Sequence, residues 1–139
     1  MGLKCSRLGL RARWTASRGS KEVTMKVSQR HFKKFQAEFN LWVERIGLKD
    51  YRIFFKHEGR NEFASVEVDE DAKHAVVCFA AELVDKYDQQ LLDPARSAKH
   101  EAIHLLLHRL VWLGQCRYVR PDDFAEEWER LVRILEKVL

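Results

Sequence analysis

The feature that most constrains this chain is a five-residue segment, His100-Glu101-Ala102-Ile103-His104, inside a stretch of sequence with strong helical character. Residues four apart share one face of a helix, so the imidazoles of His100 and His104 can reach a single divalent metal ion. Glu101 lies about 100° further round the same helix, close enough to polarise a metal-bound water. The segment therefore predicts a metal site with a neighbouring base, carried on a helix.

The helix that carries this segment has recognisable start and stop signals. Asp93 is a good N-cap and Pro94 suits the first helical position. The helical pattern can continue to Trp112 or Leu113, and Gly114 is expected to close it.

The polar residues of this helix fall on one side. His100, His104 and His108 lie within about 80° of each other on a helical wheel, with Glu101 beside them. The opposite side is apolar and consists of Ile103, Leu106, Leu107 and Leu110. A stripe of three histidines and a carboxylate is costly to bury unless something satisfies it. The spacing favours a metal over the alternative, a solvent-facing stripe without one.

Two residues compete for the place of a third metal ligand, since a catalytic zinc usually has three protein ligands and one open position. His108 is eight residues from His100, about 12 Å along the helix axis, too far for one ion to bind both. Glu127 belongs to the final helix, on the inner flank of a predicted apolar stripe of Phe124, Trp128, Leu131, Leu135 and Val138. A carboxylate that faces the core needs a partner, and a metal on the neighbouring helix would provide one. We therefore predict Glu127 as the third ligand, against the alternative that it belongs to an acidic, solvated first turn.

Such a site would support hydrolysis. Zinc bound by two histidines and a glutamate lowers the pKa of its water toward 7, and Glu101 would take the proton as that water attacks a carbonyl. A further group should stabilise the oxyanion that forms. His108, Arg117 and Tyr118 are the candidates, and the sequence does not choose among them.

The rest of the chain predicts an α+β fold. The apolar spacing over residues 29–46 indicates an amphipathic helix with Ser28 as N-cap and Gly47 as its end. Three short strands follow, at about 51–56, 64–68 and 75–79, and their short connections favour antiparallel neighbours. The last of them is uninterrupted in its apolar character, which predicts a more buried place in the sheet. Residues 81–92 are ambiguous between a short helix and a loop, and Pro121 opens the final helix.

Length and charge suggest one domain with a basic arm. A chain of 139 residues is large enough for a single core without disulfides. Residues 1–21 carry six of its basic residues and no acidic residue, so removing them changes the net charge from +4 to −2. We expect residues 1–27 to be a disordered basic arm and residues 28–139 to form the domain. Translation beginning at Met25 is an alternative for this arm, and a targeting role is a weaker one.

Composition also restricts partners and compartment. The basic excess belongs to the arm, so nucleic-acid binding is expected only through that arm. No segment is apolar over the length of a membrane span, which predicts no membrane partner. Cys5, Cys78 and Cys116 are odd in number, far apart and without metal-binding spacing. They indicate reduced thiols and hence a cytoplasmic protein.

The segment His100-Glu101-Ala102-Ile103-His104, followed by Leu105-Leu106-Leu107, resembles the active-site helix of zincin metallopeptidases. Over residues 28–139 the order helix, short sheet, motif helix and Glu-rich final helix resembles the small zincin-like proteins of phages and prophages, and so does the tract Arg117-Tyr118-Val119. The position of His108 is similar to the additional histidine of ImmA/IrrE metallopeptidases, although the downstream signature of that class is absent. SprT-like proteases are a more distant match, and no zinc ribbon follows here.

The resemblance implies a minimal zincin that cleaves a protein or peptide substrate, in the host cytoplasm if the protein is encoded by a phage. By carry-over, His100 and His104 would bind Zn²⁺, Glu101 would be the general base, and Glu127 would be a gluzincin-type third ligand. In such folds an edge strand beside the cleft binds the substrate by strand addition, a role that could fall here to residues 62–68 or 75–79. The alternative is a catalytically silent zincin fold that keeps the site for metal binding or protein interaction.

Overall fold

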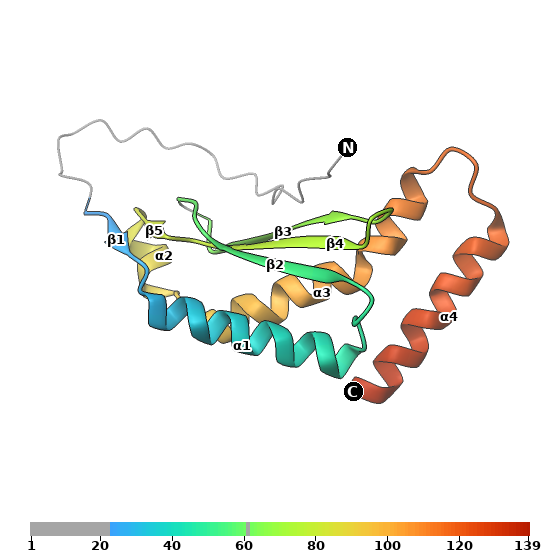
Figure 1. Cartoon of the computed structure of the whole chain (residues 1–139), viewed down its shortest axis with the longest axis horizontal. Coiled ribbons are helices and arrows are strands. Elements are labelled where there is room, and N and C mark those ends of the chain that lie inside the picture. The colour runs from blue at the N-terminus through green and yellow to red at the C-terminus, as the bar shows by residue number, and fades with distance from the viewer. Residues whose placement is uncertain (1–22, 61) are drawn as a thin grey trace.

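The computed structural model describes residues 23–60 and 62–139, and its elements confirm the α+β class. In chain order they are β1 (Met25–Lys26), α1 (Gln29–Ile46), β2 (Arg52–His57), β3 (Ala64–Asp69), β4 (His74–Phe79), β5 (Glu82–Leu83), α2 (Lys86–Gln90), α3 (Pro94–Gln115) and α4 (Pro121–Val138). Figure 1 shows α1 and α3 crossing near the three longer strands, while α4 lies at one end of the molecule. Predicted segment 1–22 lies outside the described residues.

The three longer strands form a mixed sheet in the order β2-β4-β3. β3 pairs antiparallel with β4, as expected, but β2 pairs parallel with β4, so the prediction of an antiparallel sheet is wrong for β2. The physical reason is the apolar character of β4, in which Ala75, Val77 and Phe79 are fully buried. A strand this apolar is most stable between two neighbours, which places β2 on its far side. The predicted greater burial of the third strand is confirmed.

One face of the sheet is covered by helices. Side chains of β3 alternate between buried and more exposed, as expected for a strand with one face in the core. The buried residues of β3 and β4 form one hydrophobic core with α1 residues such as Phe35 and Phe39 and α3 residues such as Ala102 and Leu105. α3 thus packs on β3, and this contact positions the candidate site.

The predicted ends of α1 and the predicted starts of α3 and α4 are confirmed. The Ser28 side chain accepts a hydrogen bond from the backbone N–H of His31, and Gly47 ends the helix with a φ of 81°. The side chain of Asp93 accepts from the N–H of Arg96, with Pro94 at the start of α3. These capping bonds satisfy N–H groups that have no partner within the helix.

Several boundaries differ from prediction. Met25 begins β1, which pairs with β5, and Val27 is buried in the core, so the folded domain starts before residue 28. Helix α3 continues through Gly114 and ends at Gln115. Within residues 81–92 the structure has β5 and the short α2. None of the helices in the described part of the chain has both the length and the apolarity that a membrane span requires.

The final helix is rotated from its predicted orientation. Its buried residues are Glu127 and Leu131, whereas Trp128 is 69% exposed and Phe124 and Leu135 are each about 40% exposed. The line of burial is therefore shifted by about 60° round the helix toward Glu127. The apolar stripe that was expected to face the core is largely open to solvent.

Candidate metal centre

Two imidazoles converge at the centre of α3. The Nε2 atoms of His100 and His104 are 3.0 Å apart, and the ring planes are inclined by 73°. Their four-residue spacing on one helix produces this approach, as the sequence predicts. Each ring therefore directs a nitrogen to the same point in space.

Glu101 lies beside the pair and is only 7% exposed. It lines a cavity of about 270 Å³ together with His100 and Ser97 of α3, and with Phe63 and Ala64 at the start of β3. The cavity lies where the N-terminal half of α3 faces the end of β3. It brings a carboxylate and an imidazole of the motif to the same concave surface.

The histidine pair fits a zinc ion. Two nitrogens bound to tetrahedral zinc at about 2.05 Å would be about 3.3 Å apart, close to the separation found here. The donors are neutral imidazoles, which zinc prefers among nitrogen ligands. Within residues 23–60 and 62–139, no group of three or more His, Cys, Asp or Glu residues has the geometry of a metal site. The structure therefore provides two ligands of the predicted three.

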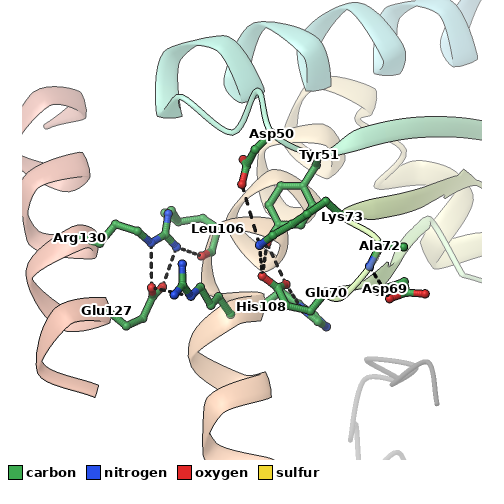
Figure 2. A network of polar contacts seen from close by, with 11 residues as sticks. Asp50, Tyr51, Asp69, Glu70, Ala72, Lys73, Leu106, His108, Glu127 and Arg130 are labelled. Carbon is green, nitrogen blue, oxygen red and sulfur yellow. Dashed lines mark hydrogen bonds and ion pairs between the residues drawn. The ribbon is translucent and has the colours of Figure 1, made fainter. Parts of the chain in front are cut away.

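The predicted third ligand, Glu127, is occupied elsewhere. Its carboxylate accepts hydrogen bonds from Arg130 at 2.6 Å and 2.9 Å, and Arg109 lies 3.5 Å from it (Figure 2). Arg130 also donates to the backbone carbonyl of Leu106 on α3. Arg109 and Leu106 lie on the side of α3 turned away from His100 and His104. The expectation that Glu127 joins the histidines is thus corrected: two guanidinium groups supply the partner that its burial requires.

His108 takes part in a different polar network. Its Nδ1 is 2.9 Å from the carboxylate of Glu70, which also accepts hydrogen bonds from Tyr51 and Lys73 (Figure 2). The Nε2 of His108 is buried without a hydrogen-bond partner in the described part of the molecule. A buried Nε2 cannot reach a substrate oxygen in this arrangement, which argues against the oxyanion role considered for His108.

Burial and hydrogen bonding set the ionisation of this network. Burial raises the pKa of Glu70, but hydrogen bonds from Lys73, His108 and Tyr51 outweigh it and hold the pKa below the ordinary range of a glutamate. Burial, and then the neighbouring Glu70, raise the pKa of Tyr51. At neutral pH Glu70 is therefore a buried anion that three side chains stabilise. The sequence analysis missed this residue because an acidic turn, Asp69-Glu70-Asp71, gave no sign that one of its acids points inward.

The remaining oxyanion candidates are at the far end of α3. Tyr118 is 86% exposed, and Arg117 lies over its ring with 5.7 Å between the guanidinium carbon and the ring centroid. Both residues follow the end of α3 at Gln115, which is about 16 Å along the axis from His104. The structure does not bring Tyr118 or Arg117 to the histidine pair.

A second cavity, of about 520 Å³, lies toward the other end of β3. It is lined by Glu67, Asp69, Glu70 and Asp71 on one side and by His108 and Trp112 of α3 on the other. Both cavities therefore lie along the junction of β3 and α3. This junction forms a cleft beside an edge strand, since β3 pairs with a neighbour on one side alone.

Comparisons with family models, with curated proteins and with solved structures found no match for this chain. The likeness to zincins consequently depends on the motif residues and on the order of the elements.

Proposed function

We propose that this protein is a zinc-dependent metallopeptidase. The observation that carries the proposal is the convergence of the His100 and His104 nitrogens, 3.0 Å apart, beside a buried Glu101 that lines a cavity. Zinc in such a site acts as a Lewis acid that acidifies water and polarises a carbonyl. Glu101 would accept the proton of the attacking water and later deliver it to the leaving amine.

The substrate would be a protein or peptide bound in extended conformation. β3 has a free edge next to α3, whereas β4 is paired on both sides, so of the two predicted segments only residues 62–68 remain available. A peptide added to this edge would form backbone hydrogen bonds with β3 and pass the motif residues at its Ala64 end. We place this activity in the cytoplasm because Cys78 and Cys116 are free thiols.

The first experiment is metal analysis combined with a single substitution. Protein purified without chelators and re-exposed to zinc should contain about one zinc per chain. His104→Ala should abolish this binding, because a single imidazole remains. His74→Ala, which removes a histidine outside the motif, is the matched control and should retain the metal.

A hydrolysis assay then separates the peptidase from the alternative of a silent metal-binding domain. Wild-type protein with zinc should cleave unfolded protein or mixed peptide substrates, and a chelator should stop cleavage. Zinc binding without cleavage of any substrate would support the silent domain. Absence of zinc from re-exposed wild-type protein would contradict both functions.

A further inference from the structure

Helix α4 has two faces of different character. One face packs on the body of the molecule through Glu127 and Leu131, with Ile134 and Val138 partly buried beside them. The other face exposes a stripe of large apolar side chains, which we call the α4 stripe: Phe124, Trp128, Val132, Leu135 and Leu139. These residues fall within about 80° on a helical wheel, so they form one continuous strip along the whole helix.

The α4 stripe has the spacing of a helix-packing surface. Phe124, Trp128, Leu131 and Leu135 follow one another at intervals of four, three and four residues, the repeat of a two-stranded coiled coil. Trp128 is 69% exposed near the middle of the strip, and large aromatic side chains dominate the energy of protein interfaces. An apolar strip of this length on a helix end of the molecule indicates a binding surface.

The charges of α4 indicate which partner fits. Its first half, residues 121–129, contains five acidic residues and no basic residue, whereas its second half, residues 130–138, contains three basic residues and one acidic residue. A second copy of α4 packed antiparallel would place each acidic half against a basic half. A parallel copy would place acid against acid. Antiparallel packing is also the arrangement that a two-fold axis across the helices generates.

We infer that two copies of this chain associate through the α4 stripe, with their α4 helices antiparallel. A two-fold axis near Val132 would place Trp128 of one chain opposite Leu135 of the other. Glu127 would not take part, because Arg130 and Arg109 hold it on the other face. The interface would lie on α4 rather than on β3, the strand that carries the candidate substrate edge. The inference is independent of the proposed function.

The oligomeric state of the full-length protein tests this inference. Sedimentation equilibrium from about 1 µM to about 1 mM covers the range in which small interfaces dissociate, and the wild type should show a reversible monomer–dimer equilibrium. Trp128→Glu should raise the dissociation constant at least about tenfold, since it places a charge in the centre of the stripe. Leu41→Glu, at an equally exposed apolar position of α1, should leave it unchanged. Circular dichroism should show that both variants remain folded.

Cysteine cross-linking tests the orientation. Under mild oxidation Val132→Cys should form a covalent dimer above the wild-type background, because the two residues lie near the axis. Phe124→Cys should not, since an antiparallel arrangement separates its two copies by about 24 Å. Cross-linking of Phe124→Cys alone would overturn the antiparallel arrangement. A wild type that stays monomeric throughout would overturn the inference and assign the stripe to another occupant, such as residues 1–22 or a different protein.

Discussion

Helix α3 contacts a buried glutamate on each of two sides, and the two have opposite surroundings. Glu101 lines a cavity next to two converging imidazoles, whereas Glu127 is 2% exposed and enclosed by Arg130 and Arg109. Both residues satisfy the rule that a buried carboxylate needs a partner. The cation that meets the carboxylate decides what it can do: a guanidinium neutralises it permanently, whereas a cavity leaves room for a substrate and a water.

The largest expected effect is on hydrolysis, at Glu101. Glu101→Gln should lower the rate of peptide cleavage by at least about 100-fold while zinc remains bound, because an amide cannot accept a proton and both imidazoles persist. Rates should be measured beside the zinc content of the same samples. Glu127→Gln is the paired control and should keep both cleavage and zinc. Loss of zinc from Glu101→Gln would make Glu101 a ligand and contradict its role as a base.

The second effect is on stability, at Glu127. Glu127→Gln should lower the free energy of unfolding by about 1–3 kcal/mol, because it leaves the Arg130 guanidinium without its anionic partner; the partial exposure of that arginine limits the loss. Burial lowers and Glu127 raises the pKa of Arg130, with the hydrogen bond from Glu127 dominant, so the arginine stays charged. Urea unfolding measures the change, with Glu129→Gln on the exposed face as control. A larger effect on zinc affinity than on unfolding would restore Glu127 as a ligand.

The smallest effect concerns acid stability, at Glu70. Its pKa is lower in the folded protein than in the unfolded chain, so its contribution is complete above about pH 4.5 and is lost as the pH falls further through the folded pKa. Wild type should therefore be more stable than Glu70→Gln at pH 7, by about 1–2 kcal/mol, and the difference should shrink below pH 4.5. Thermal unfolding between pH 3 and pH 7 tests this, with the exposed Glu67→Gln as control. A difference independent of pH would show that the charge of Glu70 is not what stabilises the fold.

Local signals in the sequence were sufficient for the helices and for the motif. Ser28, Gly47, Asp93 and Pro121 act on their immediate neighbours, so the positions of caps can be read without knowing the tertiary structure. The four-residue spacing of His100 and His104 is equally local. These parts of the prediction agree with the structure because their causes lie within one turn of helix.

The sheet order and the orientation of α4 could not be predicted in this way. The alternation of apolar residues in β2 is the same whether its neighbour is parallel or antiparallel, so the sequence pattern does not distinguish the two pairings. The rotation of α4 depends on Arg130, which both holds Glu127 and reaches the carbonyl of Leu106, 24 residues earlier. Such contacts are set by the assembled fold, and so is the inward position of Glu70.

The parallel pairing of β2 with β4 has a consequence for the order in which the sheet forms. β3 and β4 are joined by a tight turn and can pair as a local hairpin, whereas Arg52 of β2 must find His74 across 22 residues of chain. Closing the longer loop costs more entropy, so we expect the hairpin to form early and β2 to add to it late. By the same reasoning, the amide protons of β2 should exchange with solvent faster than those that join β3 to β4. The strand that the apolar β4 recruits to its far side is thus the one that folding secures last.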